Sequence, residues 1–224
     1  KIPGDQDDIP QNSGKRRTTA NYKMDLNQQK GTLRAYYASG SVVDALVGKI
    51  LTALETTGQR DNTIVIFTSD HGYHLGEHDM WQKVSIHEES AKVPLIISVP
   101  GKKPAVCRSL SELIDLYPTV SQLCGLKIPG NIQGKDISGM FDDPSVKVRD
   151  AALSSGKGRL LRTEKWALLD YGKKGELYDM ENDPKQYDNL FEKSEYADTL
   201  AGLKAKLKAK LNEIGKNDLN LNKL

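Results

Sequence analysis

The sequence has 224 residues, enough for one large domain or for one domain with a small appendage. Hydrophobic residues make up 38% of it and charged residues 28%, a composition typical of an ordinary soluble globular protein. Because 32 basic residues face 30 acidic ones, the net charge is only +2, which gives no reason to expect nucleic acid or an anionic membrane surface as a partner. Any attraction for an anionic ligand must be local.

Residues 1–26 form a loop by composition. The opening segment is polar and rich in Pro and Gly, which suits neither a signal peptide nor the start of a compact domain; it reads KIPGDQDDIPQNSGKRR. We therefore expect a surface loop that belongs to a longer chain. No apolar stretch approaches the roughly 20 residues that cross a bilayer, so the sequence predicts no membrane span.

A helix and a strand follow. From about Asn27 to Thr57 the apolar residues recur at helical spacing, which predicts a long amphipathic helix with one buried face. Gly58 is suited to end this helix. Thr63–Thr68 is short, β-branched and apolar on both faces, which predicts a buried strand of a parallel sheet. Helix, turn and buried strand form one repeat of an α/β fold.

The middle of the chain alternates polar loops with short regular elements. Residues 73–92 are expected to form an ordered loop with a turn of helix near His87–Ser90. Val93–Val99 reads as a second buried strand, and Leu113–Leu123 as a short helix that Gly125 stops. Residues 127–150 are punctuated by Pro and Gly and are expected to be loop.

After Arg149 the pattern changes to short strand-like pieces separated by Gly and Lys turns, which predicts a small antiparallel sheet. The four pieces are Ala151–Ser154, Arg159–Thr163, Trp166–Tyr171 and Glu176–Asp179. A helix with Lys on its outer face is predicted from Ser194 to about Ile214. We accordingly expect a main α/β region over residues 1–150 and a C-terminal subdomain over residues 151–224.

A polar cluster directly follows the first predicted strand, where ligands sit in open parallel sheets. Asp70 and His71 are metal ligands by residue type, and Gly72 lets the backbone turn away. Lys83 is a flexible cation within reach of the same place, suited to an oxyanion. A metal beside a lysine would make a site for a tetrahedral oxyanion such as sulfate or phosphate.

Plainer interpretations stay open for each of these residues. Asp70 can cap a turn, His71 can be a hydrogen-bonded structural residue, and Lys83 can point into solvent. Four histidines at positions 71, 74, 78 and 87 also suggest zinc, but their spacing matches no standard zinc pattern. Cys107 and Cys124 can pair or be free; burial tendencies favour two buried thiols.

The long string around the cluster resembles the second half of the sulfatase family, within the alkaline phosphatase superfamily. It reads NTIVIFTSDHGYHLGEHDMWQKVSIHEESAKVPLIISVPG, with Ser-Asp-His-Gly after a strand, then Leu-Gly-Glu-His, a Lys, and Glu-Glu-Ser before Val-Pro-Leu-Ile. Further matches extend the resemblance roughly from Arg34 to Leu190. It implies the C-terminal part of an alkaline-phosphatase-like α/β sheet flanked by helices, with a small antiparallel sheet and a helix as C-terminal subdomain.

Within the family the chain looks most like iduronate-2-sulfatase and its bacterial relatives, which also place an Asp-His pair at the metal. By this resemblance Asp70 and His71 bind a divalent cation, usually Ca²⁺, and Lys83 is a catalytic residue that binds the sulfate group. Tyr73, His74 and Trp81 fall where such enzymes shape the sugar pocket. Sulfated carbohydrates or small sulfate esters are the implied substrates. A periplasmic, lysosomal or extracellular location is implied by the family alone.

The sequence also departs from the family pattern. The family's nucleophile is a formylglycine made within a Cys-x-Pro-x-Arg type motif, and neither Cys107 nor Cys124 lies in one. The family's first metal aspartates are absent too, since Asp7-Asp8 follows no strand. We therefore expect this chain alone to be inactive and to require the N-terminal half, as a second chain or a missing segment, for formylglycine.

Two other functions remain open at this point. A phosphodiester or phosphonate hydrolase of the same superfamily shares Ser-Asp-His-Gly, but its two-metal members use zinc. The chain can also be a catalytically silent fragment that binds sulfated sugar or acts as a scaffold.

Overall fold

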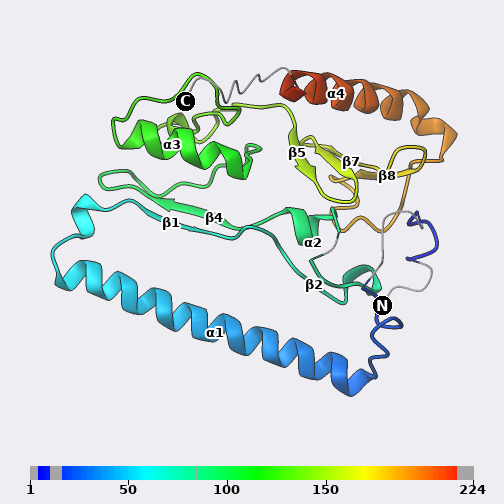
Figure 1. The fold of residues 1–224 in the computed structure, drawn as a ribbon, viewed down its shortest axis with the longest axis horizontal. Helices are drawn as coiled ribbons and strands as arrows, with labels where there is room; N and C mark the ends of the chain where they lie inside the picture. Colours follow the sequence, from blue (N-terminus) through cyan, green and yellow to red (C-terminus); the bar gives the residue numbers. More distant parts are fainter. Residues whose placement is uncertain (1–4, 11–16, 84, 216–224) are drawn as a thin grey trace, which may run out of the picture. The chain divides into compact units, whose positions relative to one another are not determined.

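The computed structural model describes residues 5–10, 17–83 and 85–215 (Figure 1). The chain divides into two compact units. Unit 1 comprises residues 1–7 and 14–103, and unit 2 comprises residues 8–13 and 104–224. Each unit is described separately below.

Unit 1 begins with the long helix α1, Leu26–Thr56. Asp25 caps its N-terminus by accepting from the backbone N–H of Gln28 at 2.8 Å, while the Gln28 side chain accepts from the Asp25 N–H at 2.9 Å. Thr57 is the C-cap of this helix, and Gly58 follows at φ +67°, so the predicted helix and its glycine stop are confirmed. The predicted buried face is wrong, because no residue of α1 is buried.

By length and composition alone, α1 is also apolar enough to cross a membrane, which corrects the expectation that no stretch of the sequence reaches this level. A helix whose apolar side is covered by other protein passes the same test. Its exposed apolar side chains are Leu26, Tyr36, Tyr37, Val42, Val43, Leu46 and Ile50.

After the 3-10 turn Arg60–Asn62, strands β1 (Val65–Thr68) and β4 (Leu95–Ser98) form a two-stranded antiparallel sheet. Both predicted strands exist, but the expectation of buried parallel strands is wrong. The side chains of Phe67 and Ile96 are 39% and 62% exposed. Strands that are apolar on both faces need covering layers on both sides. No other described strand pairs with either outer edge.

Between these strands lies a compact loop region. It contains the short strands β2 (His74–Leu75) and β3 (Trp81–Gln82), which pair antiparallel, the 3-10 turn Glu77–Asp79, and α2 (Glu88–Ala91). The turn of helix expected near His87–Ser90 is thus confirmed. The opening segment, expected to be surface loop, contributes Asp5 as a buried side chain.

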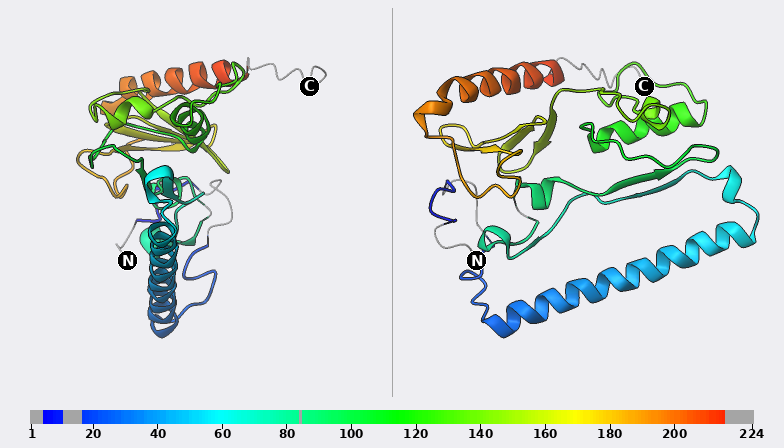
Figure 2. Two further views of the ribbon diagram at one scale, coloured as in Figure 1. Left: turned by 90° about the vertical axis from the view of Figure 1, so that its left-hand side faces the viewer. Right: turned by 180° about the vertical axis from the view of Figure 1, so that it is seen from behind.

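Unit 2 is built on a four-stranded antiparallel sheet in the order β5-β6-β7-β8, which confirms the predicted small sheet (Figures 1 and 2). The strands are β5 (Ala152–Ser155), β6 (Arg159–Arg162), β7 (Trp166–Asp170) and β8 (Gly175–Asp179). After the 3-10 turn Ser194–Tyr196, helix α4 (Ala197–Gly215) lies along one face of this sheet (Figure 2). The core packs Leu203 and Leu207 of α4 against Leu161, Leu168 and Leu177.

The rest of unit 2 contains the 3-10 turn Leu113–Asp115, helix α3 (Leu116–Leu123) and the 3-10 turn Ser138–Phe141. Cys124 is the C-cap of α3, and Gly125 follows at φ +67°, as expected. Cys107 and Cys124 are both free, and neither is buried, so the expectation of buried thiols is wrong. The predicted division at residue 150 stays a prediction.

A buried ion pair links the segments of unit 2. Arg149 contacts Glu112 at 2.7 Å and also binds the fully buried carboxylate of Asp115. The same Asp115 accepts from the backbone N–H of Lys135 at 2.8 Å. Glu112 accepts from the backbone N–H of Leu153 at 2.6 Å. Hydrogen bonds of this kind are what allow charges to remain inside a fold.

Candidate functional site

Three of the predicted site residues lie together just beyond the end of β1. The Nε2 atom of His71 is 3.6 Å from Oδ1 of Asp70 and 2.7 Å from Nζ of Lys83. The Asp70 side chain is 86% exposed, and Lys83 is also exposed. The chain thus brings a carboxylate, an imidazole and an ammonium to one accessible place, although Lys83 follows His71 by twelve residues.

The other ring nitrogen of His71 determines what Nε2 can do. Nδ1 lies 2.8 Å from the carbonyl oxygen of Gly72, the distance of an N–H donated to that carbonyl. In this tautomer Nε2 carries the lone pair. It can then accept from Lys83 or bind a cation, and a backbone carbonyl behind the ring is the support that ligating histidines commonly have.

The residues present fit part of a divalent cation site. Asp70 and His71 supply two donors of suitable type, whereas Ca²⁺ takes six to eight ligands. Among residues 5–10, 17–83 and 85–215, no group of three or more His, Cys, Asp or Glu side chains is arranged to hold a metal ion. A complete Ca²⁺ site would need further ligands beside Asp70 and His71.

Gly72 is required for close packing. A Cβ atom at this position would lie 2.1 Å from the carbonyl oxygen of Glu89, and the Gly72 N–H donates to the Ser90 carbonyl at 2.9 Å. Its φ lies outside the left-handed range, so the sharp turn expected from the sequence is not what demands glycine. Only a residue without a side chain allows the backbone after His71 to lie against α2.

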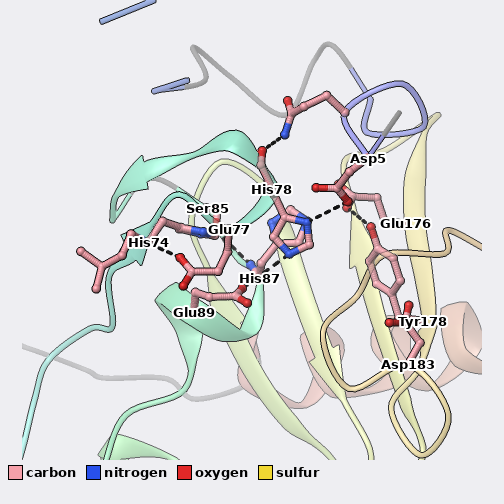
Figure 3. Close-up of polar contacts among 12 residues, drawn as sticks. Asp5, His74, Glu77, His78, Ser85, His87, Glu89, Glu176, Tyr178 and Asp183 are labelled. Atoms are coloured by element: carbon pink, nitrogen blue, oxygen red, sulfur yellow. Dashed lines mark hydrogen bonds and ion pairs between the residues drawn. The ribbon is translucent and has the colours of Figure 1, made fainter. Parts of the chain in front are cut away.

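Three histidines of unit 1, His74, His78 and His87, form a buried cluster (Figure 3). The rings of His78 and His87 are tilted with centroids 4.6 Å apart, and His74 lies 6.1 Å from each. Nδ1 of His78 is 3.3 Å from Asp5, and its Nε2 is 3.7 Å from Glu89. All three histidines are buried and belong to the polar interior of unit 1.

The environment of this cluster changes the pKa values of its members in opposite directions. Burial, together with the nearby His87, lowers the pKa of His74 to about 4. Burial alone would lower the pKa of His78 too, but the hydrogen bonds and negative charges of Glu89 and Asp5 outweigh burial and raise it. Burial likewise opposes ionisation of Glu89, yet its contact with His78 lowers the pKa of that carboxyl. The raised pKa of His78 and the lowered pKa of Glu89 both favour the charged forms of this contact, whereas the lowered pKa of His74 favours its neutral form.

The three residues predicted to shape a sugar pocket differ in accessibility. His74 and Trp81 are 1% and 3% exposed, with His74 Nε2 2.6 Å from the Ser85 hydroxyl and the Trp81 indole N–H donating to Thr19 at 2.9 Å. Tyr73 is half-buried and lies 5.2 Å from the Tyr36 ring of α1. Contact with a substrate remains a prediction for all three.

The backbone around the cluster is strained in a way that the sequence did not indicate. His78, Asp79 and Gln82 have φ values of 52°, 53° and 70°, a region that L residues rarely adopt. Each such residue costs about 1–3 kcal/mol and persists only where its surroundings impose it. Contacts with the N-terminal residues hold this loop in place: those to Asp5, Gln6, Arg17 and Thr19, and the bridge between Thr18 and Met80.

Comparison with known proteins identifies the family. The sulfatase family model matches residues 6–126, and the model of the C-terminal region of N-sulphoglucosamine sulphohydrolase matches residues 76–213. N-acetylglucosamine-6-O-sulfatase of Bacteroides thetaiotaomicron is 32% identical over 183 residues, which cover 74% of this chain and 33% of that protein.

Solved structures agree with this match. The structure of a 2-O GAG sulfatase superimposes with a TM-score of 0.83 and 26% identity, covering 98% of this chain and 51% of its own. A structure in complex with its substrate D-glucosamine-2-N,6-O-disulfate gives a TM-score of 0.74 and 31% identity, covering 85% and 42%. Phosphonate monoester hydrolases match as well.

The match covers only part of each of these relatives. The chain spans between a third and a half of their length. The names of these relatives refer to several different sulfated sugars, and none of them names iduronate-2-sulfatase. The α/β fold with its small antiparallel sheet corresponds to part of the sulfatase fold. The chain belongs to the sulfatase family.

Proposed function

We propose that this chain is the C-terminal part of a sulfuric ester hydrolase that acts on sulfated carbohydrate. The observation that carries the proposal is the contact of Lys83 Nζ with His71 Nε2 at 2.7 Å, beside the exposed carboxylate of Asp70. One accessible place thus combines donors for a cation with a positive charge for an oxyanion. Relatives named for sulfated sugars support the choice of substrate class.

Each residue has a role that follows from its chemistry. Asp70 and His71 would hold a divalent cation, which when bound supplies Lewis-acid polarisation of sulfate oxygens. We propose Ca²⁺, because Asp70 is a hard oxygen donor and the family typically uses this ion. Lys83 would hold its ammonium against sulfate oxygens as negative charge develops on them. The carbonyl of Gly72 fixes the His71 ring for its task.

The nucleophile is proposed to lie outside this chain, on formylglycine. Both cysteines in the sequence lack the required motif, as noted above, so the chain alone is expected to be inactive. The N-terminal half of the sulfatase, as a second chain or as the preceding segment, would also cover apolar surface. The exposed side chains of α1, together with Phe67 and Ile96, offer such a surface within unit 1.

Intact-mass measurement and peptide mapping of material purified from the native source test the partner. We expect a formylglycine-containing peptide, either on a second chain or on the same longer chain. A preparation that contains only a 24.8 kDa species and hydrolyses no sulfate ester would favour the silent fragment. Fractionation of that source tests the periplasmic, lysosomal or extracellular location that we propose from the family alone.

Sulfate release by the complete protein tests the site. The substrate panel should include N-acetylglucosamine-6-O-sulfate, a 2-O-sulfated iduronate and a phosphonate monoester. The iduronate substrate tests the resemblance to iduronate-2-sulfatase suggested by the Asp70-His71 pair. The phosphonate tests the alternative function as a phosphonate hydrolase. Metal analysis should find Ca²⁺, and zinc with phosphonate cleavage would contradict the proposal.

A matched pair of lysine variants makes this test specific. Lys83→Ala should lower kcat/KM for the sulfate ester by on the order of a hundredfold or more, since it removes one charge-stabilising contact. Lys92 is a suitable control because its side chain is 77% exposed and its nearest carboxylate, Glu88, is 3.9 Å away. Lys92→Ala should leave the rate unchanged, and equal effects of the two variants would contradict the role of Lys83.

A further inference from the structure

Unit 2 contains a cavity of about 460 Å³ whose residues take no part in the proposed sulfatase site. Its walls come from three segments that are distant in sequence: residues 108–110, residues 144–147, and the end of β6 with the residues after it. The polar groups that line it are Arg108, Ser109, Ser145, Lys147, Arg162 and Glu164. A volume of this size lies within the range of pockets that bind small organic molecules.

The walls are held together by hydrogen bonds. The Ser109 hydroxyl donates to the carbonyl oxygen of Val146 at 2.6 Å, which joins the first wall to the second. The second wall is fixed internally, because Asp143 accepts from the Ser145 N–H at 2.9 Å and from its hydroxyl at 2.6 Å. These bonds connect two of the three segments that line the cavity.

The cavity is positively charged. Three cationic side chains, Arg108, Lys147 and Arg162, line it against one carboxylate, Glu164. Lys147 pairs with Glu164 at 2.6 Å, which neutralises one of the three. Arg162 is oriented through Nη1, which donates to the carbonyls of Thr163 and Glu164. Among the described residues, Arg108 is exposed and has no carboxylate partner.

We propose that this cavity is a second saccharide site, which binds a sulfated sugar unit without cleaving it. An excess of cations selects an anion, and Arg presents donors that match the oxygens of a sulfate or carboxylate group. The volume suits a sugar ring that carries the anion, and it exceeds what a bare sulfate ion would fill. The choice of a sulfated sugar rests on the proposed function, whereas the charge and the cavity do not.

Such a site would hold a polymeric substrate on the protein without taking part in its cleavage. A polymeric substrate held at unit 2 stays close to the chain between cleavage events, which raises the effective concentration of its other sulfate groups. The expected consequence is a lower KM for sulfated polymers than for sulfated monosaccharides, with the rate of the chemical step unchanged.

Binding of N-acetylglucosamine-6-O-sulfate to the whole 224-residue chain tests the proposal directly. Titration followed by backbone amide NMR should shift the amide signals of Ser109 and Ser145 in a saturable manner. Arg108→Gln should weaken this binding by about fivefold to tenfold, because it removes a charged donor. Glu164→Gln should tighten it, since the only carboxylate of the cavity is lost.

The controls separate this site from the sulfatase site. Lys173→Gln changes an exposed lysine of the same unit, in the turn between β7 and β8, and should leave binding unchanged. Lys83→Ala should leave the saturable shifts of Ser109 and Ser145 unchanged, because these two amides report on the cavity; loss of these shifts in Lys83→Ala with no loss in Arg108→Gln would overturn the second site and leave the proposed function intact. Equal binding by Arg108→Gln and the parent chain, or complete displacement by an equal concentration of sodium sulfate, would likewise overturn it.

Discussion

The two units differ in what their interiors contain. The interior of unit 2 is largely apolar, with Leu161, Leu168 and Leu177 of the sheet packed against Leu203 and Leu207 of α4. The interior of unit 1 holds polar groups beside Met80, Trp81 and Ile86: the buried His74, His78 and His87, with Asp5, Asp79 and Ser90. Its longest helix buries nothing. Unit 2 therefore has an apolar core of its own, whereas α1, β1 and β4 of unit 1 leave apolar side chains exposed.

The chain has two tryptophans, and they report on the two units separately. Trp81 lies in unit 1 and Trp166 in unit 2. In a Trp81→Phe background fluorescence follows the unfolding of unit 2, and in a Trp166→Phe background it follows unit 1. Because the interior of unit 2 is more apolar than that of unit 1, we expect unit 2 to unfold at a higher denaturant concentration than unit 1.

The largest change is expected for Arg149→Met. Removing this guanidinium leaves the buried carboxylate of Asp115 without its counter-charge, which should cost unit 2 about 3–5 kcal/mol of unfolding free energy. Lys206→Met is the matched control, because it breaks a surface pair with Asp150 and should cost at most about 1 kcal/mol. Urea unfolding followed by Trp166 measures both. Similar losses in the two variants would contradict the importance of burial.

A pair of leucine substitutions sharpens the contrast between the interiors. Leu168→Ala opens a cavity in the core of unit 2 and should cost about 2–5 kcal/mol. Leu46→Ala removes as many atoms from α1, but that side chain is 51% exposed, so the cost should stay within about 0.5 kcal/mol. If Leu46→Ala destabilises unit 1 as strongly, then α1 already has its partner within this chain.

The histidine cluster predicts that acid destabilises unit 1. The pKa of His74 is about 4 in the folded chain and 6.5 when exposed, so between these values the unfolded chain binds a proton that the folded one does not. Stability should fall as pH falls from 6.5 to about 4, by up to about 3 kcal/mol. His78 opposes this change, because its raised pKa adds stability below 6.5 that is lost as pH rises through the folded value.

Replacing His74 isolates its share of the pH dependence. His74→Gln removes this titration, so unit 1 should lose less stability between pH 6.5 and pH 4 than it does with His74 present. Unfolding followed by Trp81 at several pH values makes the measurement. An unchanged pH profile in His74→Gln would show that another group controls the acid transition.

The sequence predicted the elements well wherever local chemistry determines them. Periodicity gave α1 and α4, and the Gly and Lys turns gave the four strands of unit 2. Gly58 and Gly125 both adopt the left-handed conformation expected after a helix. In each case the information lies within a few residues of the element that it specifies.

The sequence failed where the answer depends on distant residues. The two apolar strands read as parallel, but their direction relative to one another follows from the long loop that joins them. The spacing of the histidines at 74, 78 and 87 did not predict that they cluster. Contacts of His78 with Asp5 and Glu89, which the spacing does not reveal, help to set the arrangement and charge of the cluster. The residue types placed Lys83 within reach of the same site as His71, but the contact between the two side chains depends on how the eleven intervening residues fold.

The smallest effect on stability is expected at the proposed site itself. Lys83 is exposed, and its contact with His71 exchanges readily with water, so Lys83→Gln should change the stability of unit 1 by no more than about 0.5 kcal/mol. The same position is expected to matter on the order of a hundredfold for sulfate ester cleavage by the complete protein. Unfolding followed by Trp81 and a rate measured on the complete protein give both quantities.

If Lys83→Gln instead destabilised unit 1 by several kcal/mol, the lysine would stabilise the fold of the loop, and a loss of activity would no longer argue for contact with sulfate. A large kinetic effect without a stability effect is the combination that separates a residue kept for chemistry from one kept for packing.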